Sequence, residues 1–167
     1  MKMEGKIMAD DIEKAQIGTG RKDNLKVISF DDELEKLYME PTKDALVKNF
    51  HLRAVYSPDE LLKIIEDPSV EIDQLIFDII VEIPPQDERL KDKELHNLGL
   101  EILALLRSGA LGDKRKKLPV ILLTGTTYRD TIDKLNKILQ TDSYTLLLQK
   151  PTAPSKLIES IKEMHKI

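Results

Sequence analysis

The sequence predicts an α/β domain, a doubly wound (βα)5 arrangement around a five-stranded parallel sheet, and three observations support this prediction. Five short apolar runs rich in branched side chains alternate with five segments of helical periodicity. Strands that alternate with helices favour a parallel sheet covered on both faces, since each crossover places a helix on one side. The chain has 167 residues and is 41% hydrophobic, which suits one domain with a real core.

The expected strands are the apolar runs, and each is short and bounded by polar or turn-forming residues. In chain order they are LKVISF (25–30), LRAVY (52–56), QLIFDII (74–80), LPVILLT (118–124) and YTLLL (144–148). The runs at 25–30 and 74–80 are apolar enough for strands buried on both faces of the sheet. We expect residues 25–167 to form the domain and residues 1–24, which are polar and lack sustained periodicity, to form a flexible tail.

The expected helices show apolar residues three and four positions apart, the spacing of one helical face. They span 33–50, 58–67, 98–109, 131–140 and 154–166. Ser57 to Glu60, SPDE, is a capping-box start with Ser57 as the N-cap. Pro41 interrupts the first helical segment, so that helix is expected to kink or restart there.

Composition excludes several classes of function. A net charge of −4 argues against nucleic acid as the main partner, because phosphate binding needs a clustered positive surface. The absence of cysteine excludes disulfides, thiolate metal sites and cysteine catalysis. No apolar run approaches the length of a membrane span and no signal sequence is evident, so we expect a cytoplasmic protein without a membrane partner. His51, His96 and His165 lack zinc-like spacing, which favours surface or structurally satisfied histidines.

Polar side chains end four of the five expected strands. Asp31 and Asp32 follow the first, Asp78 lies near the end of the third, Thr124 ends the fourth, and Lys150 follows the fifth. Ligands of open parallel sheets bind outside the carboxyl ends of the strands, so these side chains are expected to share one site.

Three clustered carboxylates repel one another and raise their own pKa values unless a cation intervenes. A hard divalent ion with oxygen ligands, Mg²⁺ above all, resolves this repulsion, and Lys150 adds a further positive charge. Such a site suits phosphoryl transfer onto a carboxylate, with Asp78 as the nucleophile and Thr124 as a hydrogen-bond donor to a phosphoryl oxygen.

The order Asp-Asp, Asp, Thr and Lys-Pro at successive strand ends resembles the receiver domain of two-component response regulators, which has a flavodoxin-like, CheY-like fold. The resemblance covers about residues 24–167. It implies that Asp31 and Asp32 bind Mg²⁺ together with Asp78 and the backbone carbonyl of Ile80. It implies further that Asp78 is the phosphoacceptor, that the Thr124 hydroxyl reorients on phosphorylation, and that Lys150, before a cis Pro151, contacts the phosphate.

The sequence departs from the receiver pattern in the segment after Asp78. The glycine that opens the third helix follows the phosphoacceptor by about eight residues in the family, whereas Gly99 follows Asp78 by 21. We therefore expect an insertion at about 84–97, as a lid, a docking element, an early extension of the helix or simply an exposed loop. The position of the family's switch aromatic is Leu147, and the apolar Ile80 implies slow autodephosphorylation.

The resemblance also implies partners. The phosphate donor would be a histidine kinase or a histidine phosphotransfer protein, and the chain would be a phosphoacceptor rather than a turnover enzyme. A downstream protein would bind the face formed by the helix at 131–140, the strand at 144–148 and the helix at 154–166, which carries Lys134, Lys137 and Lys156. A homodimer is also compatible with the resemblance. With no output segment after the last helix, we expect the chain to act by binding a partner or by passing the phosphate on, unless it is a fragment of a longer protein.

Two alternatives remain from the sequence. The first is a pseudo-receiver, a protein-interaction module that works without phosphorylation, which the altered loop after Asp78 and Leu147 favour. The second is an aspartate-nucleophile phosphatase of the haloacid dehalogenase type. That class needs a second Asp two residues after the nucleophile, where this chain has Ile80.

Overall fold

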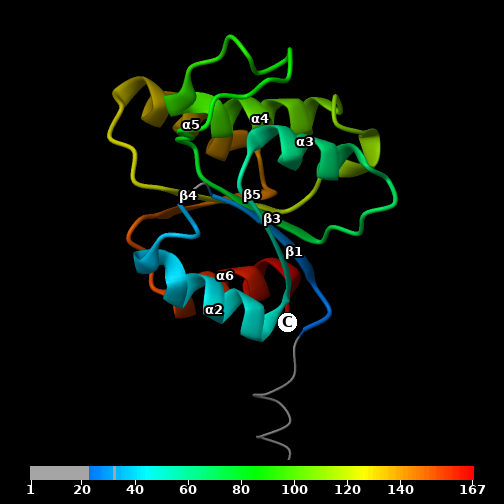
Figure 1. Cartoon of the computed structure of the whole chain (residues 1–167), viewed down its shortest axis with the longest axis vertical. Helices are drawn as coiled ribbons and strands as arrows, with labels where there is room; N and C mark the ends of the chain where they lie inside the picture. Colours follow the sequence, from blue (N-terminus) through cyan, green and yellow to red (C-terminus); the bar gives the residue numbers. More distant parts are fainter. Residues whose placement is uncertain (1–22, 32) are drawn as a thin grey trace, which may run out of the picture.

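A computed structural model describes residues 23–31 and 33–167 of the chain. In this part of the chain, five strands form one parallel sheet in the order β2-β1-β3-β4-β5 (Figure 1). The strands are β1 (Lys26–Phe30), β2 (His51–Val55), β3 (Gln74–Phe77), β4 (Val120–Thr124) and β5 (Thr145–Gln149). Because every neighbouring pair is parallel, all five carboxyl ends lie at one edge of the sheet. The strand order reverses between β1 and β3, where ligands of such sheets bind.

Helices cover both faces of the sheet. In Figure 1, α2 and α6 lie on one face, and α3, α4 and α5 lie on the other. The helices are α2 (Glu40–Asn49), α3 (Pro58–Glu66), α4 (Leu98–Ser108), α5 (Arg129–Thr141) and α6 (Pro154–His165). Three single 3₁₀ turns precede or connect them: η1 (Leu37–Met39), η2 (Leu95–Asn97) and η3 (Asp113–Arg115). The doubly wound (βα)5 architecture predicted from the sequence is therefore confirmed.

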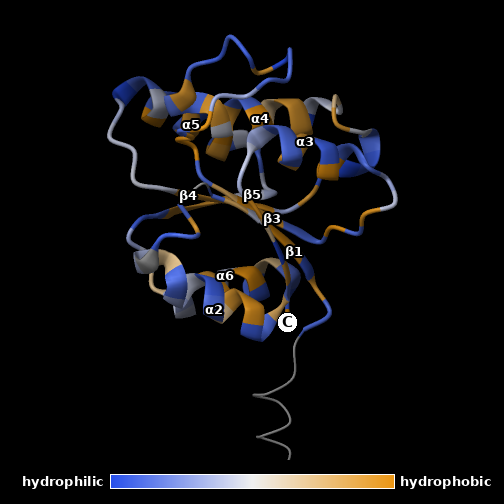
Figure 2. Ribbon diagram, viewed as in Figure 1, coloured by the Kyte–Doolittle hydropathy of each residue, from blue (hydrophilic) through white to orange (hydrophobic). Residues whose placement is uncertain are grey.

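The hydrophobic core is divided by the sheet into two clusters. Figure 2 shows apolar segments of the helices turned toward the strands. The larger cluster joins the sheet to α3, α4 and α5, and the smaller one joins it to α2 and α6. Strands β3 and β4 are buried along their whole length, which explains their continuous runs of apolar residues.

Two expected element boundaries differ from the structure by three residues or more. The strand expected over 74–80 ends at Phe77, because the backbone turns away from the sheet at Asp78 and the Ile80 N–H bonds to the Asp78 side chain. The helix expected over 33–50 begins at Glu40, because the residues before it form tight turns, such as the bond from the Met39 N–H to the Lys36 carbonyl. The restart expected at Pro41 is confirmed, since this proline lies in the first turn of α2.

Other local expectations have clear outcomes. The Ser57 side chain accepts a hydrogen bond from the Glu60 N–H and so caps α3 as predicted. The tail expected over residues 1–24 lies, apart from its last two residues, outside the described part of the chain. Among the described residues, no helix combines the length and apolar character that crossing a membrane requires.

Candidate functional site

The carboxyl edge of the sheet holds the side chains that the sequence placed at strand ends. Asp31 directly follows β1, Asp78 directly follows β3, Thr124 is the last residue of β4, and Lys150 directly follows β5. Asp32 lies outside the described residues. Since β1 and β3 are adjacent in the sheet, Asp31 and Asp78 leave it side by side at the point where strand order reverses.

Lys150 joins the two acids. Its Nζ lies 2.9 Å from Asp31 Oδ2 and 2.8 Å from Asp78 Oδ2. Asp31 is only 4% exposed and Asp78 only 8%, so this is a nearly buried cluster of two carboxylates and one ammonium. Its net charge of −1 is costly in a poorly solvated place unless another cation approaches.

The second oxygen of each carboxylate is held by its own loop. Asp31 Oδ1 accepts a hydrogen bond from the Glu33 N–H at 2.9 Å, and Asp78 Oδ1 accepts one from the Ile80 N–H at 3.2 Å. Both acids thus form the local turn that aspartate favours, in which the side chain bonds to the backbone two residues on. Each carboxylate is fixed in orientation by its loop and faces Lys150 with its other oxygen.

Burial controls the electrostatics of this cluster. Desolvation raises the pKa of Asp78 above its ordinary value, even though Lys150 acts in the opposite direction. Burial would also favour the neutral amine of Lys150, yet the charges of Asp78 and Asp31 outweigh it and raise the pKa of Lys150. Lys150 is therefore a fixed cation at neutral pH, while Asp78 gives up its proton less readily than an exposed aspartate does.

Thr124 lies beside Lys150 rather than in the acid cluster. Its carbonyl accepts a hydrogen bond from the Lys150 N–H, and its Oγ1 accepts one from the Thr126 N–H. A cavity of about 320 Å³ opens next to it, lined in part by Leu147 and Lys150. Thr124 and Leu147 therefore line one cavity. The peptide bond between Lys150 and Pro151 is cis.

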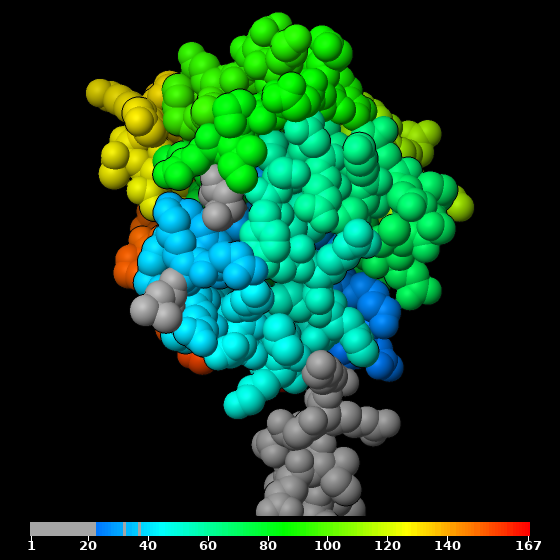
Figure 3. Space-filling model, viewed as in Figure 1, coloured from blue at the N-terminus to red at the C-terminus, as the bar shows by residue number. Residues whose placement is uncertain are grey.

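The long loop between β3 and α4 is built into the fold. Gln86 and Asp87 donate backbone hydrogen bonds to the Asp59 carboxylate of α3, at 2.7 to 3.1 Å. Arg89 forms ion pairs with Asp87 and with Glu66 at the end of α3. The space-filling view shows this loop, in green, as part of the surface above α3 (Figure 3).

The expected alternatives for this insertion can now be compared with its structure. Residues 78–94, all of which are described, contain neither helix nor strand, and α4 begins only at Leu98. The segment at 84–97 is therefore no early extension of the helix beyond the single 3₁₀ turn of η2. Leu90 is fully buried among core residues, so the loop is anchored from within as well as to α3.

The donor set at the cluster suits a hard divalent cation. Asp31 and Asp78 contribute buried carboxylate oxygens, and the negative charge of the pair exceeds what Lys150 supplies. Ile80 lies on the same loop, two residues after Asp78, so its carbonyl belongs to the segment that borders the site. The residues present therefore fit the Mg²⁺ site expected from the sequence.

Sequence reasoning missed two features around the cluster. Tyr38 donates a hydrogen bond to the Glu33 side chain and lines a cavity of about 280 Å³ that also touches Lys150 and Pro151. The role of Asp59 in holding the long loop was also missed. Neither had a local signal, because Tyr38 lay within an expected helix and Asp59 within a standard capping sequence.

Solved structures of known proteins resemble this chain, and the resemblance concerns the fold. No protein-family model matches the sequence, and no curated protein matches it. Solved structures do match. One match is a CheY-like response regulator receiver domain protein from Methanospirillum hungatei. The matched region spans 86% of this chain and 96% of that protein, with a TM-score of 0.56 and 20% sequence identity. The chain has the fold of a response regulator receiver domain.

Two further receiver structures agree. The receiver domain of the Francisella response regulator 1452 is 20% identical, with a TM-score of 0.57 over 86% of this chain and 98% of its own. The chemotaxis response regulator CheY4 of Vibrio cholerae is 17% identical, with a TM-score of 0.58 over 85% of this chain and 99% of its own. At such identities, the likeness to receiver domains concerns the fold, and the function depends on the residues at the sheet edge.

Proposed function

We propose that this chain is a phosphoacceptor receiver, in which Asp78 accepts a phosphoryl group from a phosphohistidine. The observation that carries the proposal is the contact of Asp78 Oδ2 with the Lys150 ammonium. A second buried acid, Asp31, contacts the same ammonium, and both acids lie where the strand order of the sheet reverses. An acid in this position contacts a cation and lies at the carboxyl edge of the sheet. The receiver fold supports the same role.

The chemistry is a transfer between two nucleophiles. An Asp78 carboxylate oxygen forms a bond to phosphorus while the P–N bond of the phosphohistidine breaks, and the donor imidazole leaves and takes up a proton. Lys150 stabilises the charge on the transferred group through its ammonium. Asp31, Asp78 and the Ile80 carbonyl, with Asp32 from the sequence, would hold Mg²⁺, which when bound adds positive charge next to the phosphoryl oxygens.

The donor would be a histidine kinase or a histidine phosphotransfer protein, and the chain would act stoichiometrically rather than as a turnover enzyme. A downstream partner would bind the face of α5, β5 and α6. Lys134, Lys137 and Lys156 are exposed on these two helices, which favours a partner with an acidic surface. Thr124 and Leu147 would connect phosphorylation to this face, since they line one cavity between the site and α5.

One observation favours the alternative of an unphosphorylated pseudo-receiver. Leu147 is a partly buried aliphatic residue packed against the core, so β5 carries no ring that could alternate between two positions at this site. A module that binds its partner in a single conformation would need no such switch.

The deciding experiment is phosphorylation by a small-molecule donor. The purified chain is incubated with Mg²⁺ and acetyl phosphate or phosphoramidate, and intact-mass spectrometry measures addition of one phosphoryl group. We expect labelling of the wild type and of Asp44→Asn, an exposed control, and none of Asp78→Asn. Labelling that persists in Asp78→Asn contradicts the assignment, and a wild type that is never labelled supports the pseudo-receiver.

A further inference from the structure

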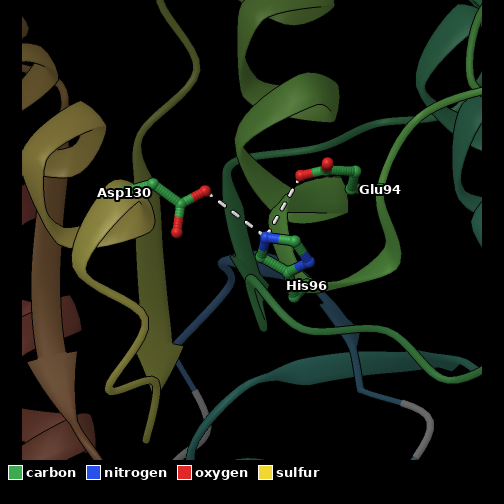
Figure 4. A group of neighbouring side chains, drawn as sticks. All are labelled: Glu94, His96 and Asp130. Atoms are coloured by element: carbon green, nitrogen blue, oxygen red, sulfur yellow. Dashed lines mark hydrogen bonds and ion pairs between the residues drawn. The ribbon is translucent and has the colours of Figure 1, made fainter.

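A second group of metal-ligand side chains lies outside the proposed phosphoacceptor site. Glu94 and His96 lie at the end of the β3–α4 loop, and Asp130 lies in the first turn of α5. His96 Nε2 is 3.1 Å from Glu94 Oε2 and 3.4 Å from Asp130 Oδ2 (Figure 4). One ligand atom from each residue lies within 4.8 Å of the others. Figure 4 shows the three side chains pointing toward one another.

The separations of these atoms suit one coordinated ion. Metal–nitrogen and metal–oxygen bonds of about 2.0–2.2 Å place neighbouring ligand atoms roughly 3.0–3.5 Å apart in octahedral or tetrahedral geometry. Both distances from His96 Nε2 fall in that range. The His96 side chain is 29% exposed, so an ion has access from solvent and water can complete its coordination.

Two buried polar residues, Asn97 and Thr131, orient the carboxylates of the cluster through hydrogen bonds. Asn97 is 2% exposed, and its Nδ2 donates to Glu94 Oε2 at 3.3 Å and to Asp130 Oδ2 at 3.2 Å. The side-chain oxygen of Asn97, Oδ1, in turn accepts a hydrogen bond from the fully buried Thr131 hydroxyl. Groups that fix the direction of metal ligands in this way are a regular part of protein metal sites.

The orientation of the His96 imidazole and the negative charge of the two carboxylates also favour binding of a cation. The Tyr128 ring packs against the His96 ring at a tilt of 36°, with centroids 4.6 Å apart, and limits the rotation of the imidazole. The two carboxylates together carry a charge of −2, which a divalent ion neutralises.

We propose that Glu94, His96 and Asp130 bind a divalent transition-metal ion of the Zn²⁺ class. One imidazole nitrogen with two carboxylate oxygens is a mixed donor set that suits such ions, whereas Mg²⁺ prefers oxygen alone. The ion links the end of the loop that leaves Asp78 to the start of the helix that follows Thr124. The site is separate from the phosphoacceptor and does not depend on the proposed function.

No pattern in the sequence indicated this site, and the physical reason is simple. His96 lacks a second histidine or cysteine at zinc-like spacing, and Asp130 is 34 residues away in the chain. Only the packing of α5 beside the end of the loop brings the three groups together. For His96, the proposed ligand role goes beyond the sequence expectation of a surface or structurally satisfied histidine.

The test is calorimetric titration of the full chain with Zn²⁺ in the presence of excess Mg²⁺. We expect one ion per chain, with affinity reduced at least about tenfold in His96→Ala and in Asp130→Asn. Asp133→Asn removes the same charge from an exposed position on the same helix and should leave the affinity unchanged. Thermal unfolding of each variant shows whether it remains folded.

Several outcomes would overturn the proposal. These are a wild type that does not bind Zn²⁺, affinity unchanged in both His96→Ala and Asp130→Asn, or binding lost equally in Asp133→Asn. Loss of Zn²⁺ binding in Asp78→Asn would place the ion at the other site and contradict the assignment to His96. Retention in Asp78→Asn supports it, independently of whether Asp78 is phosphorylated.

Discussion

Gly99 packs directly against the backbone of Asp78. A Cβ atom at position 99 would lie 2.3 Å from the Asp78 carbonyl oxygen and 2.5 Å from the Ile79 Cα. The Gly99 N–H also donates to the Ile79 carbonyl at 2.8 Å. The first turn of α4 therefore holds the loop after β3 in place, and it can approach so closely only because residue 99 has no side chain.

Replacing Gly99 with alanine should displace this loop. The clashing atoms are backbone, which cannot rotate away, so we expect a loss of about 1–3 kcal/mol in the free energy of unfolding. Urea denaturation measures this loss. Gly125→Ala is the matched control, because a Cβ there would meet only Lys150 Cβ at 3.8 Å, an ordinary contact. Equal stability of Gly99→Ala and the wild type would contradict the packing argument.

Asp31→Ala should weaken Mg²⁺ binding. Asp31 contributes one of the two described carboxylates of the cluster, and its loss leaves Asp78 paired with Lys150 at a net charge of zero. We expect affinity to fall at least about tenfold, measured by calorimetric titration with Mg²⁺. Asp44→Ala, an exposed acid on α2, should bind Mg²⁺ as the wild type does. Unchanged affinity in Asp31→Ala would show that the ion is held elsewhere.

Asp78→Asn should stabilise the fold near neutral pH. Burial raises the pKa of Asp78, so the folded chain binds this proton more tightly than the unfolded chain. Stability therefore falls as pH rises from the ordinary value of 3.8 through the raised value, and it stays lower above that. Asparagine resembles the protonated form, so the variant should unfold at higher temperature near pH 7 and lose this advantage below about pH 4.

Asp142→Asn provides the opposite case. Burial alone would raise the pKa of Asp142, but hydrogen bonds from Arg107 and Thr145 lower it below its ordinary value. Asp142 thus contributes stability above its unfolded pKa that is lost as pH falls, so Asp142→Asn should lower the unfolding temperature near neutral pH. A difference of about 1 kcal/mol corresponds to roughly 2–4 °C in a domain of this size. If both variants shift the same way, burial of Asp78 is not the dominant effect.

Asp59→Ala should release the loop between β3 and α4. The Asp59 carboxylate accepts the backbone N–H groups of Gln86 and Asp87, so its removal exposes both amides to water. Hydrogen exchange followed by mass spectrometry or NMR should speed up at these two amides. Glu60→Ala, one residue along α3, should leave their exchange unchanged. Equal protection in Asp59→Ala would mean that the buried Leu90 and the ion pair between Arg89 and Glu66 hold the loop without Asp59.

The periodicity of the sequence was sufficient to predict the sheet, its helices and the side chains at its carboxyl edge. Strand ends of a parallel sheet meet at one edge whatever the details of packing, so Asp31, Asp78 and Lys150 could be grouped before any coordinates. Boundaries were less predictable. The apolar run 74–80 continues past the strand, because Ile79 is buried in the core cluster that joins the sheet to α3, α4 and α5 although it lies outside β3.

What the sequence determined by itself is the order of the elements and the identity of the groups at their ends, because both depend on local pattern and chain connectivity. The tertiary structure alone decided which groups meet across the chain: the Lys150 ammonium between Asp31 and Asp78, Gly99 against Asp78, and His96 between Glu94 and Asp130. Contacts of this kind depend on how helices and loops pack, and that packing follows from the burial of the whole core rather than from any short segment.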